Sequence, residues 1–265
     1  MAPVTGTWRM QLFRQSYGEG PPLLIIHGLF GASGNWVTLA RNVYAKHFRT
    51  VTLDLRNHGR SPHAPEFSYD VMSQDVLMLM EEEGMEHAHI IGHSMGGKLA
   101  MHLALEHPEA VDRLLVADIG PQDYPARHGT LFDAMEALHP EHYSSREEID
   151  VVLSRDIPAS AVRQFLMKNL QRNGDAFAWG INLPAIRQGY GEIIGPIESW
   201  ETFDGETLFV RGGNSDYLVE SDMTRIRALF PFADMATIEG VGHWLHAEAP
   251  KEFAELTLNF LLQGR

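Results

Sequence analysis

Residues 90–107, IIGHSMGGKLAMHLALEH, place one serine between an apolar run and a helical pattern. Ala88–Ile91 is short and apolar, as in a buried strand, whereas Lys98–Leu105 repeats apolar residues at helical spacing. Ser94 therefore falls at the turn between a predicted strand and a predicted helix. A side chain held at so sharp a corner strains its backbone, and such strain is tolerated where bulky neighbours are absent. The glycines two places before and two places after Ser94 meet that condition.

The segment from Gly92 to Gly96 also fits the pattern G-x-S-x-G, which is called a nucleophile elbow. An elbow holds the serine hydroxyl clear of the sheet edge and places the N–H of Met95 at a helix start, where it can donate to an oxyanion. The alternative is a serine helix N-cap beside glycines needed for packing. A serine hydroxyl is a poor nucleophile at neutral pH, so the first interpretation requires a base and an acid elsewhere in the chain.

Short apolar runs alternate with helical patterns along most of the chain, which predicts a doubly wound, mostly parallel α/β sheet. The predicted strands are Arg9–Tyr17 at an edge, Leu23–Ile26, Thr50–Leu55, Ala88–Ile91, Leu114–Ala117, Leu208–Val210 and Asp234–Ile238. The predicted helices are Trp36–Phe48, Tyr69–Glu83, Lys98–Leu105, Asp222–Leu229 and Lys251–Leu262. Ligands bind outside the carboxyl ends of such strands, where His27, Ser94, Asp118 and the loop after Val210 fall. On the helix Tyr69–Glu83, Asp75 and the run Glu81–Glu83 are expected to face water.

The alternation stops between residues 120 and 203. This block contains helical patterns and no clear strand, the helices being Thr130–Leu138, Arg146–Leu153 and Ala159–Leu170. It interrupts the sheet at the edge where the candidate site falls. We therefore expect a single domain with a core of residues 1–119 and 204–265 and a helical cap of residues 120–203.

His243 is the candidate base among the 14 histidines of the chain. It lies in EGVGHWLHAEAP, after the last predicted strand and before the final helix, and Gly240 and Gly242 hold its loop. This is the place of the third member in the chain order serine, acid, histidine. We expect His246 to pack against the last helix as a structural histidine.

The acid has two candidates, Asp118 in LLVADIGP and Asp216 in VRGGNSDYLV. In most hydrolases of this architecture the acid follows the later strand with the spacing G-x-x-D. Counted from Gly212, that position is Ser215, and Asp216 falls one residue late, which can turn its side chain away from the imidazole. The spacing favours Asp118, at a strand end, with Asp216 as the alternative. Either carboxylate could instead stabilise its own turn.

A second oxyanion donor is expected from HGLFG, the loop after Leu23–Ile26. The N–H of Leu29 can face that of Met95, and Phe30 is the next choice. Each such donor contributes about 3 kcal/mol of transition-state stabilisation. The alternative is a glycine-rich turn with no role in chemistry.

The composition narrows the classes of function. The 265 residues include 21 Lys and Arg against 35 Asp and Glu, for a formal net charge of -14. Such acidity argues against nucleic acids and anionic membranes as partners. The chain has no cysteine, which excludes disulfides, thiolate catalysis, zinc–thiolate sites and iron–sulfur clusters.

The same inspection gives expectations about compartment, metal and partners. No run approaches the roughly 18 apolar residues of a membrane span, and MAPVTGTWRM lacks the apolar core of a secretory signal. No H-E-x-x-H or similar spacing indicates a metal ligand set. We expect a cytoplasmic protein without cofactor or metal that acts on a small molecule. Whether it forms a homo-oligomer stays open.

Six motifs, HGLFG, DLRNHGRSPH, GHSMGGK, DIGP, GGNS and GHWLHAE, together resemble one subgroup of the α/β-hydrolase superfamily, the small YbfF-type carboxylesterases of bacteria and their mitochondrial abhydrolase relatives. The resemblance covers nearly the whole chain and is weakest in residues 120–203. It implies a serine carboxylesterase acting on short to medium-chain acyl esters through an acyl-enzyme. In that subgroup the acid belongs to the D-I-x-P motif, which implies the triad Ser94, Asp118 and His243. Asp216, beside GGNS, departs from the subgroup pattern.

Two other functions remain open at this point. An acyl-coenzyme A thioesterase would use the same chemistry on a different leaving group. A hydrolase-like binding protein with little turnover would leave the triad and the oxyanion loop unexplained.

Two sets of side chains outside the triad have alternative interpretations. In DLRNHGRSPH, Arg56, Gly59 and Ser61 are expected to shape and hold the turn, and direct contact of Asn57 or His58 with substrate is the alternative. The large apolar side chains of the cap could line an acyl pocket or form its core; they are Phe132, Met135, Phe165, Met167 and Trp179.

Overall fold

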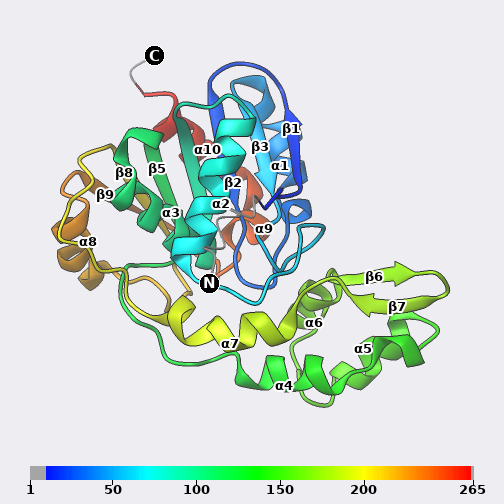
Figure 1. The fold of residues 1–265 in the computed structure, drawn as a ribbon. Coiled ribbons are helices and arrows are strands. Elements are labelled where there is room, and N and C mark those ends of the chain that lie inside the picture. The colour runs from blue at the N-terminus through cyan, green and yellow to red at the C-terminus, as the bar shows by residue number, and fades with distance from the viewer. Residues whose placement is uncertain (1–9, 264–265) are drawn as a thin grey trace, which may run out of the picture.

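A seven-stranded sheet forms the centre of the protein, and the computed structural model describes residues 10–263 (Figure 1). In spatial order the strands are β1 (Arg14–Tyr17), β3 (Arg49–Leu53), β2 (Pro22–Ile26), β4 (Ala88–His93), β5 (Val111–Ala117), β8 (Thr207–Gly212) and β9 (Ala233–Ile238). β1 is antiparallel to β3, and all other neighbours are parallel. The predicted doubly wound, mostly parallel sheet is therefore confirmed, with β1 at its edge.

Helices cover both faces of this sheet because its central strands are apolar on both sides. One face packs against α1 (Val37–Asn42), α9 (Leu245–Glu248) and α10 (Pro250–Leu261). The other packs against α2 (Tyr69–Glu82), α3 (Met95–Glu106) and α8 (Met223–Leu229). Short 3-10 turns occupy Ser33–Asn35, Tyr44–Lys46, Pro108–Ala110, Pro140–His142 and Glu220–Asp222.

The strand order reverses between β2 and β4. From β2 the chain continues to β3 on one side, whereas from β4 it continues to β5 on the other. The connections after these two neighbours therefore diverge and leave a crevice at their carboxyl ends. The loop HGLFG follows β2 and Ser94 follows β4, so the topology brings both to this crevice.

Most predicted elements of the core agree with the structure to within three residues, with two exceptions. The predicted helix Trp36–Phe48 is broken, because α1 ends at Asn42 and a 3-10 turn follows. Tyr44 in that turn is fully buried, and its hydroxyl lies 2.7 Å from the Thr257 hydroxyl of α10. The second exception is the predicted edge strand Arg9–Tyr17, which is shorter in the structure, because residues 10–13 are not in a strand and β1 begins at Arg14. Arg9 itself lies outside the described residues, as does most of the segment MAPVTGTWRM.

The prediction that Asp75 faces water is wrong. Asp75 is 1% exposed, and the Arg56 guanidinium donates to both of its carboxylate oxygens at 2.6 and 2.9 Å. Arg56 comes from the loop after β3, a partner that helical periodicity on α2 does not reveal. Of the run Glu81–Glu83, Glu81 and Glu82 are exposed, as expected, whereas Glu83 is half-buried and accepts from Arg14 Nε at 2.8 Å.

Residues 120–203 form a separate layer beneath the sheet, as Figure 1 shows. Its helices are α4 (Gly129–Ala137), α5 (Arg146–Leu153), α6 (Ser160–Met167) and α7 (Leu183–Ile194). The expectation of no strand there is wrong, because β6 (Leu170–Asn173) and β7 (Ala176–Trp179) pair as an antiparallel hairpin. Gly174 adopts a φ of 63° in its two-residue turn. The turn is Gly174-Asp175, and a glycine at the first position of a two-residue loop is a hairpin signal that outweighs the helical pattern before it.

No helix within residues 10–263 has both the length and the apolar character required to cross a bilayer.

Candidate active site

Ser94 occupies a strained turn between β4 and α3. Its φ and ψ are 53° and -121°, and its N–H donates to the carbonyl of Ala117 at 3.0 Å. A Cβ on Gly92 would lie 2.3 Å from the Gly96 carbonyl oxygen, and a Cβ on Gly96 would lie 2.5 Å from those of Ile26 and His27. Both glycines are therefore required by close backbone approach, as the elbow interpretation expects.

Backbone strain is concentrated at the same edge of the sheet. Within the described chain, the non-glycine residues with positive φ are Phe30, Asn57, Ser94 and Asp118, at 60°, 66°, 53° and 52°. They follow β2, β3, β4 and β5 respectively, so each lies beyond the carboxyl end of a neighbouring strand. Strain of this kind persists only where the surroundings enforce it, and it is typical of functional sites.

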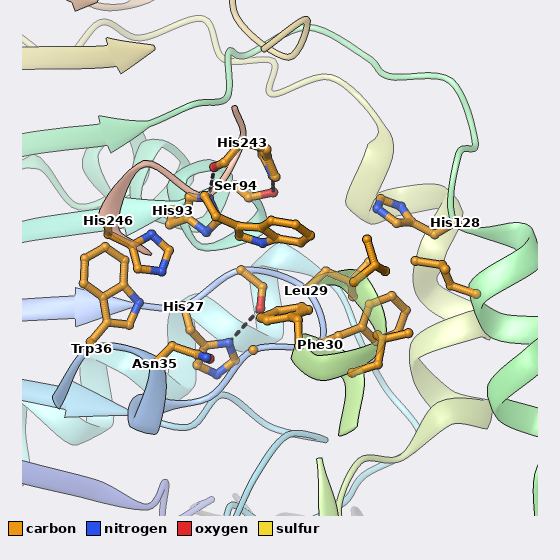
Figure 2. Close-up of a pocket in the computed structure, with 17 residues that line it drawn as sticks. His27, Leu29, Phe30, Asn35, Trp36, His93, Ser94, His128, His243 and His246 are labelled. Atoms are coloured by element: carbon orange, nitrogen blue, oxygen red, sulfur yellow. Dashed lines mark hydrogen bonds between the residues drawn. The ribbon is translucent and has the colours of Figure 1, made fainter. Parts of the chain in front are cut away.

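The three candidate triad residues meet at this edge. The Ser94 hydroxyl lies 3.0 Å from Nε2 of His243, and Nδ1 of His243 lies 2.7 Å from Oδ2 of Asp118 (Figure 2 draws the first pair). Asp118 is fully buried, whereas the His243 side chain is 20% exposed. With Nδ1–H donating to the carboxylate, Nε2 is left to accept the serine proton.

Two further groups hold the Asp118 carboxylate in place. The N–H of Gly212 donates to Oδ1 at 2.9 Å, and the Ser215 hydroxyl donates to Oδ2. In hydrolases whose acid follows the later strand, the G-x-x-D spacing puts that acid at the position that Ser215 occupies here. The spacing identified the position, but only the structure places its hydroxyl on Asp118.

The alternative acid, Asp216, lies apart from this arrangement. Its two carboxylate oxygens accept from Arg127 Nη1 at 2.8 Å each, and its side chain is 72% exposed. The Arg127 guanidinium lowers the pKa of Asp216. The imidazole of His243 thus contacts Asp118 and not Asp216.

The loop HGLFG is held by two buried histidines. His27 donates from Nδ1 to the Gly28 carbonyl at 2.8 Å and accepts the N–H of Leu55 at Nε2, at 3.0 Å. His58 accepts the N–H of Phe30 at Nε2, at 3.3 Å. Of the two donors considered, the N–H of Phe30 is therefore engaged. The N–H groups of Leu29 and Met95 have no hydrogen-bond acceptor within residues 10–263.

The DLRNHGRSPH segment has the structural role expected of Arg56, Gly59 and Ser61. A Cβ on Gly59, whose φ is 57°, would lie 2.2 Å from Oδ2 of Asp54, and Ser61 donates to the Asp54 carbonyl. Asn57 and His58 are fully buried, and neither lines the two cavities at Ser94 described below. His58 acts instead through Phe30, a link between loops that local sequence does not indicate.

A second pair of histidines supports the His243 loop (Figure 2). His93, beside Ser94, donates from Nε2 to the carbonyl of His243 at 2.8 Å. His246 stacks on Trp36, with ring centroids 4.1 Å apart, and its ring lies 6.4 Å from that of Phe253 on α10. Burial lowers the pKa of His93 well below 6.5 and that of His246 to about 3, so both rings are neutral at neutral pH.

Two cavities meet at Ser94. The first, which we call the α6 arm, has a volume of about 60 Å³ and is lined in part by His243, Trp244, Val162, Phe165 and Leu166. The second, which we call the α7 arm, has a volume of about 30 Å³ and is lined in part by Met95, Lys98, Ile193, Ile194 and Tyr217. Ser94, Leu29 and His128 line both arms.

The large apolar side chains of the cap, for which a pocket and a core position were both open, divide between the two. Trp179 lines neither arm and donates from Nε1 to the Met135 carbonyl at 3.0 Å. Phe165 lines the α6 arm, whereas Phe132, Met135 and Met167 are buried in the core. His128 lines both arms, and its Nδ1 lies 2.6 Å from the Tyr190 hydroxyl. Burial lowers the pKa of His128 to about 4.

Acid is expected to destabilise the fold through its buried histidines. Burial lowers the pKa of His58 and of His246 to about 3 from 6.5, so the unfolded chain binds protons that the folded chain does not between these values. The free energy of unfolding is therefore retained above pH 6.5 and falls as the pH drops toward 3, by about 1.4 kcal/mol per pH unit for each histidine.

Urea denaturation at about pH 7, 6 and 5 measures this slope. We expect His246→Leu to reduce the slope by about one proton, whatever its effect on stability at neutral pH. A slope unchanged by this substitution would contradict a neutral, buried His246.

Comparisons with known proteins agree with this fold. A family model described as alpha/beta hydrolase fold matches residues 21–145. The chain is 41% identical over 248 residues to the sn-1-specific diacylglycerol lipase ABHD11 of Mus musculus, covering 91% of this chain and 81% of that protein. It is 35% identical over 240 residues to Esterase YbfF of Escherichia coli (strain K12), covering 89% of this chain and 91% of that protein.

A solved structure, the "Marine microorganism esterase", superimposes with a TM-score of 0.92 at 38% identity, over 95% of this chain and 99% of that chain. These relatives place the chain among the ester hydrolases. It belongs to the alpha/beta hydrolase fold family, in the group that includes the YbfF and ABHD11 proteins.

Proposed function

We propose that the protein is a cofactor-free serine carboxylesterase whose triad is Ser94, His243 and Asp118. The observation that carries the proposal is the continuous hydrogen-bonded chain, 3.0 Å from Ser94 to His243 and 2.7 Å from His243 to Asp118. Such a chain lets the imidazole take the serine proton while the buried carboxylate stabilises the imidazolium that forms.

The reaction follows from these positions. His243 Nε2 removes the Ser94 proton as Oγ attacks the acyl carbonyl, and the N–H groups of Leu29 and Met95 hold the oxyanion. The imidazolium then protonates the leaving alkoxide, the C–O bond breaks, and an ester of Ser94 remains. Water attacks this acyl-enzyme and passes a proton to Nε2, and the carboxylic acid leaves as Ser94 regains its proton.

We also propose that residues 120–203 act as a cap. Leu131 of α4, together with Val162 and Phe165 of α6, lines the α6 arm, whereas Ile193 and Ile194 of α7 line the other. The cap therefore sets which esters fit, and residues 1–119 and 204–265 supply the triad and the oxyanion donors. The relatives named as a diacylglycerol lipase and an esterase support carboxyl esters as the substrate class, and within this class we propose esters of short to medium acyl chains.

Uncharged esters are expected to be better substrates than acyl-coenzyme A thioesters. The formal net charge of -14 repels a polyanionic leaving group. We expect kcat/KM for p-nitrophenyl butyrate to exceed that for butyryl-coenzyme A by about tenfold or more at low salt. A preference for the thioester would identify a thioesterase, and the absence of turnover on both would favour a binding protein.

A further inference from the structure

We propose that the two arms at Ser94 divide the substrate: the α7 arm receives the acyl group and the α6 arm receives the alcohol. This inference rests on the proposed esterase function and names the part of the substrate that each wall of the site selects. It assigns Ile194 and Val162, which line one arm each, as specificity-determining residues.

The position of His243 decides the direction. The imidazolium must donate its proton to the leaving oxygen, so that oxygen lies within hydrogen-bond reach of Nε2. His243 and its neighbour Trp244 line the α6 arm. The alcohol, which is attached to the leaving oxygen, therefore extends into this arm.

Tyr217 separates the imidazole of His243 from the α7 arm. Its ring stacks on that of His243, with centroids 3.9 Å apart and planes inclined by 21°. The α7 arm is lined by Tyr217 and not by His243, yet it contains Ser94 and the oxyanion residue Met95. The acyl chain, which is bonded to the carbonyl carbon, can therefore enter the α7 arm without passing the imidazole of His243, which is the proton donor.

Lys98 makes part of the wall of the α7 arm polar, which limits how far an acyl chain is accommodated. Lys98 is 1% exposed, and its ammonium donates to the carbonyls of Gln122, at 2.6 Å, and of Gly195. Burial lowers the pKa of Lys98 to about 7. An alkyl chain that reached this ammonium would desolvate it further without offering an acceptor.

The sizes of the arms are consistent with this division. The α7 arm measures about 30 Å³ and the α6 arm about 60 Å³. Phe165, Leu166 and Val162 make the wall of the α6 arm apolar, and Phe165 packs against Trp244 at a centroid distance of 5.4 Å. The preferred ester therefore combines a compact acyl group with a larger apolar alcohol, and the cap aromatic Phe165 faces the alcohol.

Two matched variants test this assignment. Ile194 on α7 and Val162 on α6 are both partly buried, both β-branched and both outside the triad and oxyanion residues. Each is replaced by alanine, and kcat/KM is measured on p-nitrophenyl esters from acetate to octanoate and on acetate esters from methyl to octyl. We expect Ile194→Ala to raise the hexanoate-to-acetate ratio by about tenfold and to leave the alcohol series within about twofold. We expect Val162→Ala to do the reverse.

Substitutions that fill the arms with a larger side chain keep the test decisive if an alanine variant does not fold. Ile194→Phe is expected to lower the hexanoate-to-acetate ratio, and Val162→Phe the octyl-to-methyl ratio. An exchange of the two responses would reverse the assignment, and responses of both series to each variant would overturn it. Both of these contradicting results can be seen only if the wild type hydrolyses esters. They are therefore distinct from a failure of the esterase proposal, in which no ester is hydrolysed in a Ser94-dependent way.

Discussion

Replacing Ser94 by alanine is expected to lower kcat by about a millionfold while the fold stays intact. The loss follows because the acyl-enzyme cannot form without Oγ, and the remaining triad members have no function on their own. The side-chain hydroxyl of Ser94 bonds only to His243 among residues 10–263, so its removal leaves no buried group unpaired.

The measurement is steady-state hydrolysis of p-nitrophenyl butyrate, with circular dichroism and thermal melts of both proteins as the control. Alanine has a Cβ as serine does, so the strained φ of 53° is kept. A variant that stays folded and retains more than about 1% of the wild-type kcat would contradict a nucleophilic role for Ser94.

The second large effect distinguishes the two candidate acids. Asp118→Asn is expected to lower kcat by about ten thousandfold, because the amide turns an N–H toward His243 and fixes the wrong imidazole tautomer. The same substitution leaves Ser215 and the N–H of Gly212 facing an altered acceptor. Asp118 is fully buried, so no water molecule can take the place of its carboxylate beside His243.

Asp216→Asn is the matched control for that experiment. Asp216 is 72% exposed and pairs with Arg127, and exposed pairs contribute about 1 kcal/mol or less. We expect its kcat/KM to stay within about threefold of wild type. Loss of activity in Asp216→Asn with retention in Asp118→Asn would show that the triad uses the later-strand carboxylate.

The sequence predicts the parts of the site that depend on local geometry. Gly92 and Gly96 indicate the elbow because backbone crossing at a strand–turn–helix corner excludes a Cβ within a few residues. His243 is identified by its loop after the last strand, and the offset of Asp216 from the G-x-x-D spacing favours Asp118, the carboxylate that contacts His243 in the structure. Each of these inferences uses spacing along one segment and the common edge of a parallel sheet.

Contacts between distant segments are the part that the sequence does not reveal. The bond from Phe30 to His58 joins the loops after β2 and β3, and it engages one of the two oxyanion donors left open by the motif. The ion pair between Arg56 and Asp75 reverses the expected orientation of Asp75. The placement of His128 in the wall of both arms depends in the same way on how the cap packs over the sheet.

Active-site labelling with a fluorophosphonate tests the central claim most directly, because the reagent bonds only to a hydroxyl that a neighbouring base has activated. Peptide mass mapping of the labelled protein is expected to find one adduct, on Ser94. The adduct should be absent from Ser94→Ala, and its rate of formation should fall by at least about a thousandfold in His243→Ala. An adduct at another residue, or a rate that does not depend on His243, would contradict activation of Ser94 by this imidazole.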